Sequence, residues 1–396
     1  MSQIDRRQAL KLLAAVGAAG LAAACATEEP ADEPQTSDKP VKIGLIAPQT
    51  GTLKAIGDEI TNGFQLYLEL NQNLLGGHPV ELVIADEGAD ARSAKAAVES
   101  LLKQGALALT GIANVGTMAG IRDTVESAKV PLIASNGIPR SLQSVLYIWC
   151  TSYVASEPSD ALAAYLKREM SSLERVTVVA PDDDNGQDAV DAFRQEFGTG
   201  DARLTSTVLT EPTVSANRSF FDTALNQVRG INPDVVYAFY SGQAATEFVK
   251  QYRAKGIRAR IYAPGFFTDG TMLADTGDEA RGIFTAMNYS ADINNAANRL
   301  FATSYRRAHD ATPSAAAMAS YDAAQVLDKA IRLSRDRLTS PQVNLMLGRV
   351  GQIDSPRGGW QFNQPRTPQQ KWYLREVRRD GQVLSNVLIN ELATLG

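Results

Sequence analysis

The chain has 396 residues, 44% of them hydrophobic and 21% charged, which is enough for two or three domains with sizeable cores. Its formal net charge is −5, and no run of Lys or Arg follows the first dozen residues, so it lacks the basic surface that nucleic-acid binding requires. Two cysteines and two histidines are too few for a structural zinc site, and we expect neither a metal nor a cofactor, although these counts do not exclude a hard cation held by oxygen ligands.

Residues 1–24 have the pattern of an export signal. Arg6, Arg7 and Lys11 precede an uncharged stretch, rich in Ala and Leu, that covers residues 12–25. This stretch has fourteen residues, whereas a transmembrane helix needs roughly 20. The sequence therefore predicts export from the cytoplasm. The Arg pair resembles a twin-arginine signal, and the general export route stays open as well.

The run Leu21-Ala22-Ala23-Ala24-Cys25 resembles a lipobox, after which a bacterial lipoprotein is acylated on cysteine. The resemblance implies lipidation of Cys25, a lipid anchor in the membrane, and a location in the periplasm or on the outer cell surface. Ala22 stands where lipoboxes usually have Leu, so an ordinary cleavable signal is the alternative. Residues 25–39 are expected to form a disordered linker, because five acids and two prolines lie among residues 26–38.

Short apolar runs alternate with helical periodicity from Val41 onward, which is typical of β-α units in a parallel sheet. Between two of these runs lies a set of apolar residues on one helical face, and a second set follows later in the chain. The sets are Ala94, Ala97, Val98, Leu101 and Leu102, and, in part, Ala245, Phe248, Val249 and Tyr252. The pattern predicts layered α/β architecture. The predicted strands are residues 41–47, 80–85, 107–111, 130–134, 176–180, 204–209, 235–239 and 261–263.

An internal similarity divides the chain into two halves. VKIGLIAPQTG, from residue 41, and RVTVVAPDDDNG, from residue 175, each end a predicted strand with Ala-Pro and a polar turn before a helix. The prolines themselves are explained by strand termination. Turns at the carboxyl ends of parallel strands are where open α/β sheets bind ligands, so two facing edges would form a cleft.

Four segments together resemble the type I periplasmic binding proteins related to the leucine/isoleucine/valine-binding protein. They are VKIGLIAPQTGTLKAIGDEITNGFQLYLELN, ALTGIANVGTMAGIRDTVESAKVPLIASNG, NPDVVYAFYSGQAATEFVKQYRAKG and SPRGGWQFNQPRTPQQKWYLREV. The resemblance covers nearly the whole chain after residue 39. It implies an α/β fold of two doubly wound Rossmann-like lobes joined by a three-crossing hinge. Lobe 1 would contain residues 40–155 and 285–360, and lobe 2 residues 156–284 and 361–396.

The same resemblance implies a substrate-binding component of an ABC importer, which performs no catalysis and delivers a small solute to a permease and ATPase complex. The solute would be a branched-chain or other apolar amino acid, or a related carboxylate. In amino-acid-binding members an acid of the second lobe takes the ammonium, and Gly265 and its neighbours lack one; nearby Asp269 is expected at the surface or at a helix cap. The implied ligand-binding residues are Asn114, Val115, Thr117, Ser135, Asn136, Tyr153, Asn185, Tyr240 and Phe266.

Other function classes fit the sequence less well. It contains no G-x-S-x-G, H-E-x-x-H or P-loop motif, and its early glycines do not form a dinucleotide-binding fingerprint. The serious alternative is a ligand sensor or cell-envelope regulator, because one fold serves many functions.

Overall fold

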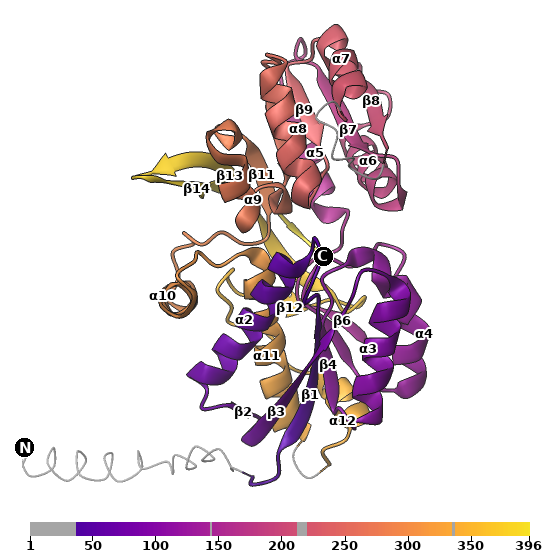
Figure 1. Cartoon of the computed structure of the whole chain (residues 1–396), viewed down its shortest axis with the longest axis vertical. Coiled ribbons are helices and arrows are strands. Elements are labelled where there is room, and N and C mark those ends of the chain that lie inside the picture. Colours follow the sequence, from indigo (N-terminus) through magenta and orange to yellow (C-terminus); the bar gives the residue numbers. More distant parts are fainter. Residues whose placement is uncertain (1–36, 143–144, 212–219, 335–336) are drawn as a thin grey trace, which may run out of the picture. The chain divides into compact units, whose positions relative to one another are not determined.

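Two β-sheets, each built mainly of parallel strands, organise the described part of the chain (Figure 1). The computed structural model describes residues 37–142, 145–211, 220–334 and 337–396. Every element reported below belongs to one unit, Asp38–Gly396. The predicted export signal, the lipidation of Cys25 and nearly all of the predicted linker lie outside the described residues.

The first sheet has six strands, with helices on both faces. Ile43 and Leu45 pack on one face against α2, α11 and α12, whereas Ile46 faces α3 and α4 on the other. All pairs are parallel except that of β2 with β3. The strand order is β2 (Leu74–Leu75), β3 (His78–Asp86), β1 (Val41–Ala47), β4 (Ala108–Gly111), β5 (Leu132–Ala134), β6 (Ile148–Cys150), and the helices are α2 (Lys54–Leu70), α3 (Ala91–Lys103), α4 (Met118–Ala128), α11 (Ala315–Ser334) and α12 (Ser340–Leu347).

The second sheet has eight strands and is also covered on both faces. Val178 packs on the side of α5 and α6, and the next residue, Val179, packs on the side of α7 and α8. The strands are β12 (Gln361–Phe362), β13 (Pro368–Asp380), β11 (Phe284–Met287), β10 (Arg260–Pro264), β9 (Val235–Ala238), β7 (Val176–Pro181) and β8 (Leu204–Thr210) in order, with β14 (Val383–Leu395) paired to β13; the helices are α5 (Glu157–Glu169), α6 (Asp184–Phe197), α7 (Asp222–Ile231), α8 (Gly242–Ala254) and α9 (Thr271–Thr276). A further helix, α10 (Ala296–His309), packs against α2 and α11.

Every predicted strand coincides with an observed strand, and the predicted α/β class with two doubly wound sheets is confirmed. The two predicted helical faces are buried, in α3 and α8 respectively, apart from Leu102 in α3, which is partly exposed. The pattern did not predict β6 and β11, which are only three and four residues long, or the antiparallel pair β13 and β14. Within the described residues the chain passes between the sheets three times, after β6, after β11 and before β12. The residue boundaries predicted for the two lobes stay a prediction.

A buried polar cluster ties the three crossings together. The guanidinium of Arg357 donates to Asp322 Oδ2 at 2.9 Å and to the carbonyl oxygen of Thr151 at 2.5 Å. The side-chain amide of Asn288 donates to the carbonyl oxygen of Ser152 at 2.9 Å, and that oxygen also accepts from Arg357. Residues from each crossing therefore share one hydrogen-bond network. Among the described residues, no helix combines the length and the apolar character needed to span a membrane.

Candidate functional site

A pocket of about 300 Å³ lies where the carboxyl ends of strands from both sheets meet. The turns after β1, β4, β5 and β6 supply residues from the first sheet, and those after β7, β8, β9 and β10 supply residues from the second. Its volume falls at the lower end of the range for small-molecule sites. The lining residues include Thr52, Ile56, Glu59, Asn114, Val115, Asn136, Tyr153, Asn185, Phe239, Tyr240, Ser241, Phe266, Asp269, Met272, Met287 and Ser314.

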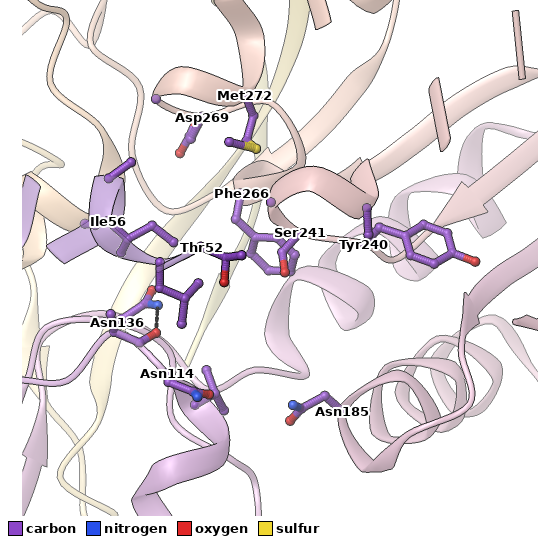
Figure 2. A pocket seen from close by; sticks show the side chains of 18 of the residues that line it. Thr52, Ile56, Asn114, Asn136, Asn185, Tyr240, Ser241, Phe266, Asp269 and Met272 are labelled. Carbon is purple, nitrogen blue, oxygen red and sulfur yellow. Dashed lines mark hydrogen bonds between the residues drawn. The ribbon is translucent and has the colours of Figure 1, made fainter. Parts of the chain in front are cut away.

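Side-chain amides line the pocket on the side of the first sheet (Figure 2). Asn136 Nδ2 donates to the carbonyl oxygen of Ala113 at 2.7 Å, and Asn136 Oδ1 accepts from the Tyr153 hydroxyl at 3.5 Å. Asn114 Oδ1 accepts from the backbone N–H of Gly116 at 3.0 Å. These bonds fix both amides, so the first sheet presents a rigid polar wall.

Two predicted ligand-binding residues, Thr117 and Ser135, are not among the residues that line this pocket. Both are buried, and their hydroxyl groups bind protein atoms instead. Thr117 Oγ1 donates to Glu87 Oε1 at 2.9 Å, and Ser135 Oγ lies 3.3 Å from Thr110 Oγ1. Their positions support the turns after β4 and β5, and they do not contact the cavity.

Aromatic and aliphatic side chains line much of the second sheet's side. Phe266 packs edge-on against Phe239, with ring centroids 5.5 Å apart. Tyr240 also touches the pocket, but Figure 2 shows its ring directed away from Phe266. That ring packs on Phe221 and Phe248 in the core, and its hydroxyl lies 3.0 Å from Thr210 Oγ1. Tyr240 is therefore mainly a core residue.

Asn185 enters the pocket from the first turn of α6. Asp183 caps that helix, since its carboxylate accepts from the backbone N–H of Gly186 at 2.8 Å. Asp182 and Asp183 thus form the predicted polar turn at the pocket's edge, and Asp184 begins α6. No group of three or more His, Cys, Asp or Glu side chains among the described residues is arranged to hold a metal ion.

Two carboxyl groups lie together at one end of the pocket. Glu59, on α2, accepts from the hydroxyl of Ser314 at 2.6 Å, and burial raises its pKa to about 7. Asp269, in the turn after β10, forms an ion pair with Arg375 at 2.8 Å, and burial raises its pKa, an effect that Arg375 opposes. The expectation that Asp269 lies at the surface or caps a helix is wrong, because only 14% of its side chain is exposed and α9 has no side-chain cap.

Sequence reasoning missed several residues of the pocket. Phe239 and Ser241 lie at the end of a predicted strand or just after it, so position alone pointed to them. Glu59 lies on α2, one helical turn after Ile56, which also lines the pocket. Ser314 precedes α11 and follows no strand, and nothing local in the sequence marks it.

The family model described as periplasmic binding protein matches residues 40–382 of this chain. Among curated proteins, Leu/Ile/Val-binding protein homolog 6 of Brucella melitensis is 24% identical over 349 residues, which cover 86% of this chain and 88% of the relative. A Leu/Ile/Val-binding protein of Rhizobium johnstonii is 24% identical over 204 residues, about half of each chain.

Solved structures of similar fold cover nearly the same region. A solute-binding protein of an ABC transporter from R. palustris, in complex with benzoate, has a TM-score of 0.80 and 26% identity over 89% of this chain and 96% of its own. A branched-chain amino acid transporter substrate-binding protein from Streptococcus pneumoniae, in complex with isoleucine, has a TM-score of 0.76 and 20% identity over 89% of this chain and all of its own. The second likeness bears on the fold alone.

Proposed function

Because the chain belongs to the periplasmic binding protein family, we propose that it is the extracytoplasmic substrate-binding lipoprotein of an ABC importer. It would capture a small solute between its two lobes and pass it to a membrane permease and its ATPase. Lipidation of Cys25, as the sequence predicts, would hold it at the membrane.

The observation that carries this proposal is the pocket at the meeting edges of the two sheets. Its walls come from separate sheets connected through the three crossings, so relative rotation of the sheets would open and close it. A solute that contacts both walls stabilises the closed form through its extra contacts there. Two of the three predicted lobe boundaries fall between the sheets, and the third, at residue 285, falls within β11.

The lining favours a solute with an apolar or aromatic body and a few polar groups. Phe239, Phe266, Ile56 and Met272 supply apolar surface, and Asn136 is among the fixed polar groups. Such a division of labour is usual in small-molecule sites. Of the two solved structures described above, one holds benzoate and the other isoleucine, and solutes of this size suit the pocket.

Thermal unfolding in the presence of a solute panel tests the proposal. A ligand that binds only the native state adds about 2.7 kcal/mol of stability at a concentration about 100-fold above its Kd. We expect at least one amino acid, amide, amine or aromatic acid to raise the unfolding midpoint by several degrees. If every small solute leaves the midpoint unchanged, the proposal fails.

A sensor with the same fold would show the same thermal shift, so the import step needs its own test. Deleting the gene should abolish uptake of the stabilising solute, labelled with a radioisotope, into cells. Undiminished uptake, with loss of a transcriptional response to the solute, would identify a sensor.

A further inference from the structure

The carboxyl groups of Glu59 and Asp269 approach one another from opposite sheets at one end of the pocket. Glu59 belongs to α2, against the first sheet, and Asp269 follows β10 of the second sheet. Gly270, the residue after Asp269, lies directly against the Glu59 side chain, since a Cβ atom on Gly270 would lie 2.5 Å from Glu59 Oε1. The negative charge of Asp269 contributes to the raised pKa of Glu59.

The charges at this end do not balance. Arg375 neutralises Asp269, and the same guanidinium also donates to Thr285 Oγ1 and to the carbonyl oxygens of Tyr289 and Gly265. Asp269 Oδ2 is nevertheless buried and forms no hydrogen bond of good geometry among the described residues, although the backbone N–H of Ala315 lies close enough to the carboxyl group to lower its pKa. An ionised Glu59 would therefore bring one negative charge without a matching cation.

Within the part of the chain that the structure describes, the groups facing Glu59 supply no such cation. Ser314 donates a hydrogen bond to it, and Asp58, Asp269 and the hydroxyl of Tyr305 are its titratable neighbours. Lys54, the nearest base along α2, is bound to Asp58 at 2.6 Å. Burial is the largest cause that raises the Glu59 pKa to about 7, and the two aspartates add to it.

At the other end of the pocket, several backbone N–H groups that could bind a carboxylate already donate to protein atoms. The backbone N–H groups of Ala113 and Asn114 donate to the buried carboxylate of Glu87, at 2.7 and 3.0 Å. The N–H of Gly116 is taken by Asn114 Oδ1, and that of Ile138 by the carbonyl oxygen of Tyr153. Among the described residues that line the pocket there is no Lys, Arg or His.

We infer that the solute is an organic amine with an apolar or aromatic body and no carboxylate, and that its ammonium group lies between Glu59 and Asp269. This rests on the proposed function and narrows the solute class of the same pocket. The ammonium would donate to Asp269 Oδ2 and supply the missing charge opposite Glu59. Phe266, Phe239 and Ile56 would enclose the body of the solute.

Calorimetric titration with matched sets of solutes tests the inference. One set is isopentylamine, leucine and isocaproate, and the other is phenethylamine, phenylalanine and hydrocinnamate, so that within each set only the charged groups differ. We expect the amine of at least one set to bind at least about tenfold more tightly than its amino acid and its acid, since a buried unpaired charge is costly. If an amino acid or an acid binds best, the amine inference is overturned while the proposed function stands. If nothing in either set binds, the amine inference fails, and the wider panel of the thermal-unfolding test decides the proposed function.

The pH dependence gives an independent readout. Binding an ammonium beside Glu59 favours its ionised form, so below its pKa of about 7 each amine bound must displace one proton. Amine affinity should therefore rise, by up to about tenfold per pH unit, until the pH reaches about 7, and then level off. An affinity that instead falls as the pH rises over this range would contradict the inference.

Substitutions distinguish the effect of the Glu59 charge on binding from any effect on folding. Glu59→Gln keeps the size and hydrogen-bonding capacity of the side chain, and it should lower amine affinity at least about tenfold and remove the pH dependence. Glu69→Gln is the matched control, because Glu69 is an exposed acid on the same helix. Equal amine affinity in Glu59→Gln and the control would overturn the inference. Isopentanol, which lacks the charge, should bind both variants alike, and this verifies that the pocket is intact.

Discussion

The aromatic side chains at the pocket have different roles because their rings point in different directions. Phe266 packs edge-on against Phe239 at the pocket wall, whereas the Tyr240 ring is buried among Phe221 and Phe248. Contact with the cavity alone does not make a side chain a ligand-binding group. The direction of the ring decides how much of its surface a solute covers.

We predict opposite effects for substitutions at these two positions. Phe266→Ala should weaken solute binding about tenfold or more, since burying a Phe side chain is worth about 1.5–3 kcal/mol. Tyr240→Phe removes only the hydrogen bond to Thr210, so it should cost about 1 kcal/mol of unfolding free energy. Solute affinity should not change in Tyr240→Phe. Calorimetric titration and urea unfolding of both variants check this. Weakened binding in Tyr240→Phe would show that Tyr240 contacts the solute.

At the scale of the elements, α2 and α11 pack so closely that one position requires glycine. A Cβ atom on Gly63 would lie 2.0 Å from the carbonyl oxygen of Ala317, and a backbone atom cannot move aside as a side chain can. Both helices also supply pocket residues, Glu59 from α2 and Ala315 from α11. The close contact thus fixes one wall of the pocket.

Gly63→Ala should therefore destabilise the protein, by about 1–3 kcal/mol, through overpacking. Gly230 provides the matched control, because it also lies in a helix, α7, but has no atom within 4 Å of its ideal Cβ position. Gly230→Ala should stabilise by up to about 1 kcal/mol through helix propensity. Urea unfolding of the two variants measures both changes, and equal effects would contradict the proposed packing.

The sequence predicts elements best where their pattern is long or strongly bounded. The continuous apolar run of β1 and the one-sided face of α8 were both identified from periodicity. β6 has only three residues, too few to show a period. β13 pairs antiparallel with both β11 and β14, and its sequence mixes the charged residues Lys371 and Arg375 with aromatic residues, so it shows no simple apolar run. Tertiary pairing, and not local pattern, specifies such strands.

The same limit applies to the candidate site. Asn114 and Asn136 were predicted because they follow buried strands, where ligands bind in such sheets. Whether a hydroxyl group faces the cavity depends on its neighbours. The Thr117 hydroxyl is bound to Glu87, and the Ser135 hydroxyl lies against that of Thr110, so neither faces the cavity. Ser314 reaches the pocket only because α11 packs on α2.

At the scale of the whole molecule, the buried cluster around Arg357 connects the two sheets. Arg357→Met should cost about 3–5 kcal/mol of unfolding free energy, because it leaves the carboxylate of Asp322 buried without its cation, with only Ser355 and Trp360 donating to it. The exposed pair Lys371 and Glu391 is the control, and Lys371→Met should cost less than about 1 kcal/mol. Urea unfolding compares the two, and a small loss in Arg357→Met would mean that the network is not the principal tie.

The account depends above all on the solute occupying the pocket between the two sheet edges. Ala55 lines this pocket from α2, so Ala55→Trp fills part of it, while Ala254→Trp adds the same side chain at an exposed position on α8. Titration calorimetry with the tightest-binding solute of the panel compares the two variants with the unmodified protein. We predict that Ala55→Trp loses the binding heat and that Ala254→Trp keeps it at one solute per chain. Unchanged affinity in Ala55→Trp would contradict the account, because the solute would then bind elsewhere.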